Sequence, residues 1–298
     1  MAGTDSTVRK EILFIINPIS GTGRHAEVEK IIHEELDPSK FNSRIVYTDA
    51  AGEATVLCKE AVEKGVDVIV AVGGDGTVNE IGQGLVGTKS ALGIIPTGSG
   101  NGLARHLKIP FNIRKAVKVI NEGKLRKIDT ATVNDKVFLS IAGIGYDAFV
   151  AKKFSKASKR GFFSYFRIVS GEYPRYKPRK YVLDIDGKTI TRRALLIAMA
   201  NSNQFGNNTS IDPNATIDDG YIDVCILRRI PLLLIPFYVP LLFTKMFHKT
   251  QYIEIIRAKH ATITRKKGKT MHFDGDPVAM GKTLDMKVNP LSLNIIIP

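Results

Sequence analysis

Short apolar runs alternate with helical patterns over the first 127 residues of the chain. Four runs are each closed by Gly, Asn, Asp or Pro, as strands are, namely Ile12–Ile16, Arg44–Tyr47, Val66–Val72 and Leu92–Ile95. Between them, apolar residues recur at spacings of three and four, for example at Val28, Ile31, Ile32 and Leu36. This alternation predicts an open, mostly parallel sheet covered by helices.

The pattern changes near Lys127. Beyond it, short strand-like runs with turn residues nearby favour an antiparallel β structure. They are Thr130–Val133, Val137–Ile141, Tyr181–Asp186, Leu195–Ala200, Tyr221–Ile226, Tyr252–Ile256, Ala261–Thr264 and Leu291–Ile297. We therefore predict an α/β domain over residues 1–127 and a β-rich domain over residues 128–298, whose last strand could pack back on the first domain.

Composition and charge narrow the functional classes. The 43 Lys and Arg against 29 Asp and Glu give a net charge of +14, which favours nucleic acid, an anionic membrane or phosphorylated ligands as partners. Hydrophobic residues at 44% and charged residues at 24% exclude intrinsic disorder and collagen-like repeats. Cys58 and Cys225 match no metal or redox spacing, which favours a reducing compartment. We read no secretion signal at the start of the chain.

Three glycine-rich segments follow predicted strands, at the carboxyl ends where open α/β sheets bind ligands. They are Asn17–Arg24, Gly73–Glu80 and Pro96–Arg105. Glycines let backbone N–H groups approach phosphate oxygens, and helices predicted to begin at Thr77 and Asn101 point their positive ends there. No Walker A loop and no G-x-G-x-x-G fingerprint occurs. The pattern predicts a polyphosphate cradle of another type, which includes Gly73, Gly74, Asp75, Gly76, Thr77, Val78, Asn79, Thr97, Gly98, Ser99, Gly100 and Asn101.

Asp75 lies inside the tightest of these segments, where a carboxylate would repel a bare triphosphate. Its place is explained if Mg²⁺ bridges carboxylate and phosphate, directly or through water. The alternative is an Asx turn that supports the loop. We predict the first role, in which Asp75 serves the metal rather than the core of the domain.

Taken together, these segments resemble the diacylglycerol kinase catalytic domain superfamily, which includes bacterial lipid kinases, sphingosine kinases and ceramide kinases. The resemblance lies in N-P-x-S-G at Asn17–Gly21, G-G-D-G-T at the start of Gly73–Glu80, and P-T-G-S-G-N at Pro96–Asn101. It continues in family order with Ala142–Asp147, Asp218–Tyr221 and Phe273–Asp276. It therefore covers nearly the whole chain.

The resemblance implies a nucleotide-binding α/β domain similar to those of phosphofructokinase and NAD kinase, then a β-rich sandwich domain, with the active site in the cleft between them. It implies ATP contacts at Asn17, Ser20, Gly21, Thr48, residues 73–79 and Thr97. A structural Mg²⁺ site of the bacterial members falls on Thr216, Asp219 and Tyr221, the first and last through carbonyl oxygens. Asp147 stands where sphingosine kinases hold the polar head of the sphingoid base.

The catalytic base is expected on the turn around Gly275. Phosphoryl transfer needs a group that positions the acceptor hydroxyl and takes its proton, and a carboxylate can do both. The candidates are Asp274 and Asp276, which the family fold brings opposite the nucleotide loops. With Asp75 they make up the predicted catalytic set.

Basic and aromatic residues interleave from Lys152 to Lys180. Such a segment suits an anionic leaflet, and we predict that it holds the protein at the inner face of the membrane. The alternatives are a nucleic-acid patch, which we do not favour, and a solvated helix face over a buried aromatic stripe. Pro231–Phe247 is too short to span a bilayer. It is expected to line a channel for acyl chains, or to be a buried helix or an irregular core segment.

The sequence thus predicts a cytoplasmic, peripherally membrane-associated lipid kinase that uses ATP and Mg²⁺. Its acceptor is expected to be diacylglycerol or a related neutral lipid. The alternatives are a sphingoid-base kinase, an NAD kinase, and a non-catalytic regulator that binds lipid or nucleotide. A homodimer is left open.

Overall fold

The computed structural model describes residues 9–19, 25–98, 100–157, 162–205 and 209–298. The chain divides into two compact units, residues 1–128 with 292–298 (unit 1) and residues 129–291 (unit 2). Several predicted residues lie outside the described ranges: Ser20, Gly21 and Ser99 of the cradle, and Lys159 and Arg160 of the basic segment.

Unit 1 is built on a parallel sheet in the strand order β2-β1-β3-β4, with the end of β16 added beside β4. Its strands are β1 (Lys10–Ile16), β2 (Phe41–Tyr47), β3 (Val68–Gly73), β4 (Ala91–Pro96) and the end of β16 (Thr283–Ile296). Strands β3 and β4 are buried throughout, as expected where helices cover both faces of a sheet. The predicted α/β domain is confirmed.

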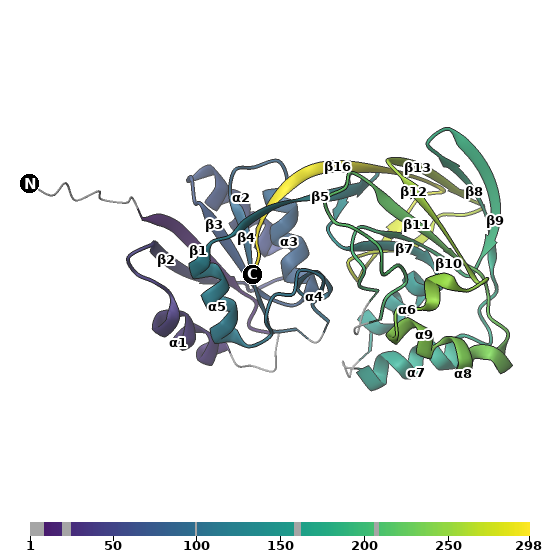
Figure 1. Cartoon of the computed structure of the whole chain (residues 1–298), viewed down its shortest axis with the longest axis horizontal. Helices are drawn as coiled ribbons and strands as arrows, with labels where there is room; N and C mark the ends of the chain where they lie inside the picture. The colour runs from purple at the N-terminus through teal and green to yellow at the C-terminus, as the bar shows by residue number, and fades with distance from the viewer. Residues whose placement is uncertain (1–8, 20–24, 99, 158–161, 206–208) are drawn as a thin grey trace, which may run out of the picture. The chain divides into compact units, whose positions relative to one another are not determined.

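Helices lie on both faces of this sheet. They are α1 (His25–Glu35), α2 (Glu53–Glu63), α3 (Asp75–Leu85), α4 (Gly102–His106) and α5 (Ile113–Glu122). Figure 1 shows α1 and α5 on one face and α2 and α3 on the other. On the first face, Phe14 and Val70 pack against Ile32 and Ile120. Helix α5 begins where the Asn112 side chain accepts the Lys115 N–H and ends at Gly123 in the left-handed conformation.

Unit 2 is a sandwich of two antiparallel layers, which confirms the predicted β-rich domain. One layer has the order β12-β11-β10-β7-β14-β15, and the other is β16-β13-β8-β9 with β5 and β6 beside β16. The core between them includes Phe138, Ile144, Ile197, Leu183 and Ile263. The strands are β5 (Leu125–Val133), β6 (Lys136–Phe138), β7 (Ile141–Gly145), β8 (Arg179–Ile185), β9 (Lys188–Ala194), β10 (Leu196–Ala200), β11 (Ile222–Leu227), β12 (Ile253–Ala258), β13 (His260–Arg265), β14 (Lys269–Phe273) and β15 (Asp276–Met280).

Two strands belong to both units, since β5 leads from unit 1 into unit 2 and β16 returns. The fully buried Asp129 stands in β5, at the start of unit 2. Its carboxylate accepts the N–H of Gly220 at 2.6 Å and that of Leu291 at 2.7 Å. The division falls after Ile128, one residue beyond Lys127.

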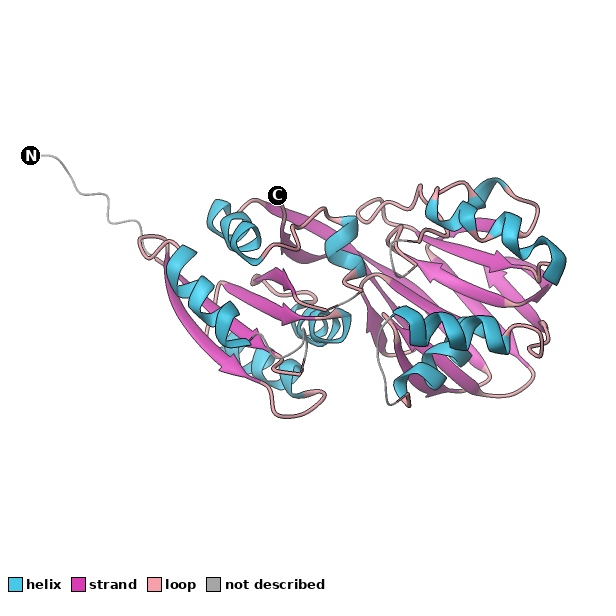
Figure 2. Ribbon diagram, turned by 90° about the horizontal axis from the view of Figure 1, so that it is seen from below, coloured by secondary structure: helices cyan, strands magenta, loops and turns pink. Residues whose placement is uncertain are grey.

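The helices of unit 2 all lie on the same side of its strands in Figure 1, and Figure 2 views them from that side. They are α6 (Tyr146–Ser155), α7 (Phe162–Glu172), α8 (Ile235–Tyr238) and α9 (Pro240–Phe243), with the 3-10 turns η2 (Leu232–Leu234) and η3 (Phe247–Lys249). Tyr146 and Val150 of α6 pack against Leu195 and Ala198. No described helix is long and apolar enough to cross a membrane.

The prediction that Pro231–Phe247 is a buried helix or an irregular core segment is wrong. Leu233 is 87% exposed and Phe237 is 70% exposed, although Phe247 is buried. Pro236 and Pro240 stand near the starts of α8 and α9 and divide the segment into helices of four residues each. Each short helix therefore buries only part of its apolar surface, since Ile235, Tyr238 and Leu241 are half-buried.

Candidate active site

The loops after β3 and β4 pack against each other at the backbone. The N–H groups of Thr97 and Gly98 both donate to the carbonyl of Gly73, at 3.0 and 3.3 Å. A Cβ on Gly98 would lie 2.6 Å from the Gly74 Cα, closer than real Cβ contacts allow. Only glycine therefore fits at Gly98, and the second and third predicted segments form one continuous structure.

Asp75 joins the same two loops through its carboxylate. Oδ2 accepts the N–H of Asn101 at 2.8 Å, and Oδ1 accepts that of Gly102 at 2.6 Å. A Cβ on Gly100 would collide with Oδ2. Asp75 thus has a structural role in addition to any role toward a metal. Helix α3 begins at Asp75 and α4 at Gly102, rather than at the predicted Thr77 and Asn101.

Asn101 is buried at the centre of this junction. Its backbone is left-handed, with φ of 51°, and its side-chain amide donates to the Gly73 carbonyl at 3.0 Å. Its Oδ1 is buried and has no hydrogen-bond partner among the described residues. The bond from its side-chain amide to Gly73 joins the two loops at the centre of the junction.

The first segment reaches the same sheet edge. The Asn17 N–H donates to the Val72 carbonyl at 3.1 Å, and its side-chain amide donates to Thr77 Oγ1 at 3.3 Å. Thr48 is buried, and its N–H donates to the Ile16 carbonyl at 3.0 Å. Asn79 is buried and contacts the Gln83 amide. The described members of the predicted cradle therefore lie along one edge.

A cavity of about 440 Å³ opens at the carboxyl ends of β1, β3 and β4. Asn17, Thr97 and Gly98 of the predicted cradle line it, but Thr48, Asp75 and Asn79 do not. It is also lined by residues that the sequence analysis missed, namely His25, Phe111, Asn112 and Arg114. These side chains come from α1 and from the start of α5, and no motif marks them.

In unit 2 the two candidate bases have different environments. The Asp274 carboxylate accepts three backbone N–H groups, from Leu139, Ser140 and Ile141, each at 2.8 Å. Asp276, by contrast, has an exposed side chain at the first position of β15. Asp274 therefore holds the chain between β6 and β7, whereas Asp276 is the more exposed of the two residues.

Asp147 lies buried in the first turn of α6 beside a histidine. Its Oδ2 is 3.1 Å from His272 Nε2, and its Oδ1 accepts the Ala148 N–H at 2.7 Å. A Cβ on Gly143 would collide with both side chains of the pair. No local pattern in the sequence links His272 to Asp147, because the two residues are far apart along the chain.

In the loop predicted to bind magnesium, the Asp219 carboxylate already has two partners. Asp219 accepts the Tyr221 N–H at 3.1 Å and pairs with Arg257 at 2.5 Å. The Thr216 hydroxyl donates to the Asn214 carbonyl at 3.2 Å. Among the described residues, no group of three or more His, Cys, Asp or Glu could hold a metal ion. Asp219 keeps these two partners, and the magnesium site stays a prediction.

Comparisons with known proteins cover both units. The diacylglycerol kinase catalytic domain matches residues 11–133, and the YegS C-terminal NAD kinase beta sandwich-like domain matches residues 140–297. A diacylglycerol kinase of Bacillus subtilis is 31% identical over 229 residues, 74% of each protein. One of Staphylococcus saprophyticus is 26% identical over 273 residues, 90% of each protein. A solved structure of a diacylglycerol kinase from Bacillus anthracis is 25% identical and aligns over 98% of each chain with a TM-score of 0.76. These matches confirm the resemblance drawn from the motifs.

Proposed function

The chain belongs to the diacylglycerol kinase family and is a lipid kinase, and we propose that it transfers the γ-phosphoryl group of ATP to the hydroxyl of a neutral, diacylglycerol-like lipid. The observation that carries the proposal is the junction of the two glycine-rich loops. Asp75, Gly98 and Asn101 lock these loops together at the sheet edge where the 440 Å³ cavity opens.

The junction supports ATP bound as its magnesium complex. Glycine-rich loops at this edge bring backbone N–H groups within reach of phosphate oxygens. Each Asp75 oxygen accepts one backbone N–H, and an ionised carboxylate oxygen can accept more than one bond. Asp75 can therefore hold Mg²⁺, directly or through water, while it keeps its structural bonds. The ion would neutralise the charge that develops on the transferred phosphoryl group.

We assign the general base to Asp276 rather than to Asp274. The Asp274 carboxylate accepts three backbone N–H groups, and taking up a proton there would turn these charge-assisted hydrogen bonds into weaker neutral ones. Asp276 lies at an exposed position, where an acceptor hydroxyl can approach it from solvent. Asp274 then positions the turn from which Asp276 acts.

The Asp147–His272 pair favours a neutral acceptor over a sphingoid base. A sphingoid base carries an ammonium group that would need an accessible carboxylate. Asp147 is buried, and its two oxygens already face His272 and the Ala148 N–H. Binding an ammonium ion there would require this pair to separate.

A radiolabelled ATP assay with a panel of acceptors tests the proposal. The panel holds diacylglycerol, monoacylglycerol, phosphatidylglycerol, ceramide, dihydrosphingosine and NAD. We expect diacylglycerol to give the highest kcat/KM, with no labelling of NAD. Asp276→Asn is the matched inactive control. Preferred labelling of dihydrosphingosine or NAD would overturn the assignment of the acceptor.

The surface of unit 2 supports peripheral contact with the membrane that holds such an acceptor. Leu233 and Phe237 on η2 and α8, and Phe163 on α7, are large exposed apolar side chains. The exposed lysines Lys152 and Lys153 lie on α6. Apolar side chains that enter the headgroup region, with lysines drawn to anionic lipids, are the features of a peripheral membrane surface.

The double variant Leu233→Ser with Phe237→Ser tests this contact by flotation with vesicles of phosphatidylglycerol and diacylglycerol. Each side chain that enters the bilayer contributes about 1.5–3 kcal/mol, so we expect vesicle affinity to fall at least about tenfold. Val56→Ser in unit 1, where the side chain is 56% exposed, is the control. Wild-type vesicle binding by the double variant would exclude this surface.

A further inference from the structure

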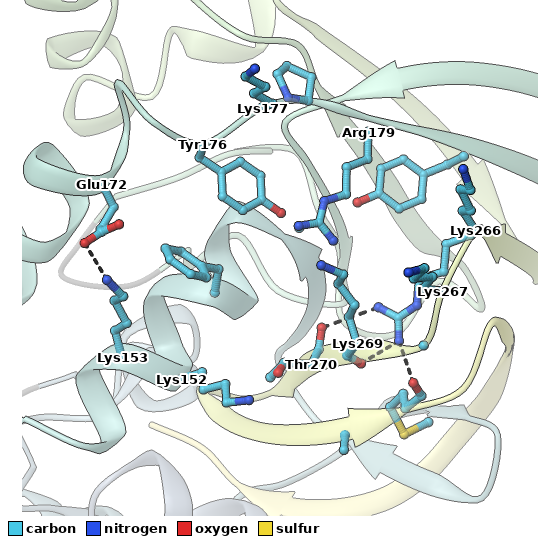
Figure 3. A pocket seen from close by; sticks show the side chains of 18 of the residues that line it. Lys152, Lys153, Glu172, Tyr176, Lys177, Arg179, Lys266, Lys267, Lys269 and Thr270 are labelled. Atoms are coloured by element: carbon cyan, nitrogen blue, oxygen red, sulfur yellow. Dashed lines mark hydrogen bonds and ion pairs between the residues drawn. The ribbon is translucent and has the colours of Figure 1, made fainter.

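A large cationic cavity lies within unit 2. Its volume is about 1640 Å³, and its described lining comes mainly from α6, from α7 and the segment that follows it, and from β13 to β15 (Figure 3). Half of the described lining residues are Lys or Arg, and Glu172 is the only acidic residue among them. Glu172 pairs with Lys153 at 2.5 Å. The cavity therefore holds a large excess of positive charge.

The turn between β13 and β14 contributes four of these cations, and the sequence analysis did not single them out. They are Arg265, Lys266, Lys267 and Lys269. Arg265 is buried and donates to the carbonyls of Lys269 at 2.6 Å, Met280 at 3.0 Å and Gly281 at 3.1 Å. The Arg265 guanidinium thus builds the turn, and the three exposed lysines are carried on a fixed backbone.

The cations crowd one another. Partial loss of hydration lowers the pKa of Lys269, and repulsion from Arg179, Lys267 and Arg265 adds to the effect. Burial also lowers the pKa of Arg265, with Arg179 acting in the same direction. Because like charges are held together here, a multivalent anion would relieve repulsion as well as gain attraction.

The cavity also has an apolar wall. Phe149 and Tyr176 line it, each with a cation over its ring, Lys153 at 5.1 Å and Arg179 at 5.3 Å from the ring centres. Met280 lines it as well. A simple anion would contact only the cationic side chains and leave the apolar wall exposed to water. A lipid with an anionic headgroup would contact both the cationic side chains and the apolar wall.

We propose that this cavity binds the phosphomonoester head of a phosphorylated lipid, with the adjoining part of an acyl chain on the apolar wall. A phosphomonoester carries about −1.5 to −2 charges near pH 7 and three strong acceptor oxygens, whereas a phosphodiester lipid carries one charge. The ligand is the product class of the proposed lipid kinase reaction, so this inference rests on the proposed function. The site would let the enzyme sense the product that accumulates in its membrane.

Binding is measured without ATP, so that it does not depend on catalysis. Vesicles of neutral phosphatidylcholine contain either phosphatidate or phosphatidylglycerol. The fraction of each anionic lipid is chosen so that both kinds of vesicle have the same surface potential. Short-chain, water-soluble phosphatidate and inorganic phosphate are titrated separately by calorimetry. The test variant replaces Lys266, Lys267 and Lys269 by Gln, and the matched control replaces the exposed Lys188, Lys245 and Lys249, which are not among the lining residues.

We expect saturable binding of one short-chain phosphatidate per chain, weakened about tenfold to hundredfold in the test variant because each lysine near an anionic head contributes to affinity. The control variant should bind within about twofold of the wild type, since its charges lie outside the cavity. Equal binding to phosphatidylglycerol vesicles would mean that the protein responds only to the surface charge of the vesicle, and it would overturn the proposal. Equal affinity for inorganic phosphate would show a free phosphate site and also overturn it.

The acceptor assay separates this inference from the proposed function. If wild-type enzyme phosphorylates diacylglycerol but binds no phosphatidate in the cavity, only the inference fails. If it binds phosphatidate and phosphorylates no lipid, the proposed function fails and the cavity remains a lipid-phosphate site.

Discussion

Asparagine substitutions at the two carboxylates of the β14–β15 turn should separate a structural role from a chemical one. Asp274 accepts three backbone N–H groups, and hydrogen bonds to a charged group contribute about 1.5–3 kcal/mol each. In Asp274→Asn the remaining oxygen can still serve Ser140 and Ile141, but the new amide nitrogen faces the Leu139 N–H. One charged bond is lost and two become neutral, so we expect a loss of about 2–4 kcal/mol in the free energy of unfolding.

The backbone does not add to this loss, because asparagine tolerates the left-handed conformation of Asp274 as well as aspartate does. For a unit of this size, the loss corresponds to a fall of roughly 5–15 °C in the Tm of unit 2. Asp276→Asn, at an exposed position, should leave stability within about 0.5 kcal/mol. It should lower kcat by roughly 10²–10⁴ with little change in KM for ATP.

The assay combines urea unfolding and differential scanning calorimetry with the radiolabelled kinase assay on both variants. The reasoning fails if Asp274→Asn keeps the wild-type Tm but loses activity while Asp276→Asn stays active. That result would make Asp274 the base and its three hydrogen bonds incidental.

Further outcomes are expected for three variants and for the two cysteines. Asp75→Ala should lower kcat more than about tenfold and also lower the Tm, because it removes two backbone hydrogen bonds as well as a ligand for Mg²⁺; an unchanged Tm would contradict the structural role. Gly98→Ala should raise KM for ATP and cost about 1–3 kcal/mol of stability through its clash with Gly74, as urea titration would show. Asp129→Ala should destabilise the chain by about 3–5 kcal/mol, since two N–H groups lose a buried charged acceptor. Burial raises the pKa of the Cys58 thiol to about 12 and that of Cys225 well above its usual range, so neither should react with a thiol reagent at pH 8 without denaturant. Above about pH 9 the unfolded thiols ionise while the native ones keep their protons, so stability should fall as pH rises.

The sequence predicted those parts of the fold that depend on local pattern. Strands β3 and β4 are uninterrupted apolar runs closed by glycine-rich loops, and a parallel sheet follows from that pattern. Strand β9 was missed because its residues Lys188–Ala194 are mostly polar and exposed, without an apolar run. Strand β15 was missed because Asp276 was interpreted as part of a turn, although it is the first residue of the strand.

For the candidate site as well, the sequence predicted only part of the arrangement. The glycine-rich segments identified the residues at the sheet edge, but not which atoms join them. Asp75 and Asn101 are 26 residues apart, and Asp129 and Leu291 are 162 residues apart. Such pairs are set by the tertiary fold, and no local pattern marks them. For the same reason, the sequence indicated the basic segment that includes α6 but not the other lysines of the cationic cavity. The lysines after Arg265 meet α6 only in the folded chain.

The return of β16 into unit 1 has a consequence for the order in which the chain can fold during its synthesis. Asn294 and Ile295 pair with Ala91 and Leu92 of β4, and the Gly87 N–H donates to the Ser292 carbonyl. These partners leave the ribosome only after all of unit 2 has been made. Until then β4 is an open edge strand, which can pair with other chains. The first unit to be translated therefore completes its sheet last, and a nascent chain stalled before Ser292 would be prone to aggregate through the edge of β4.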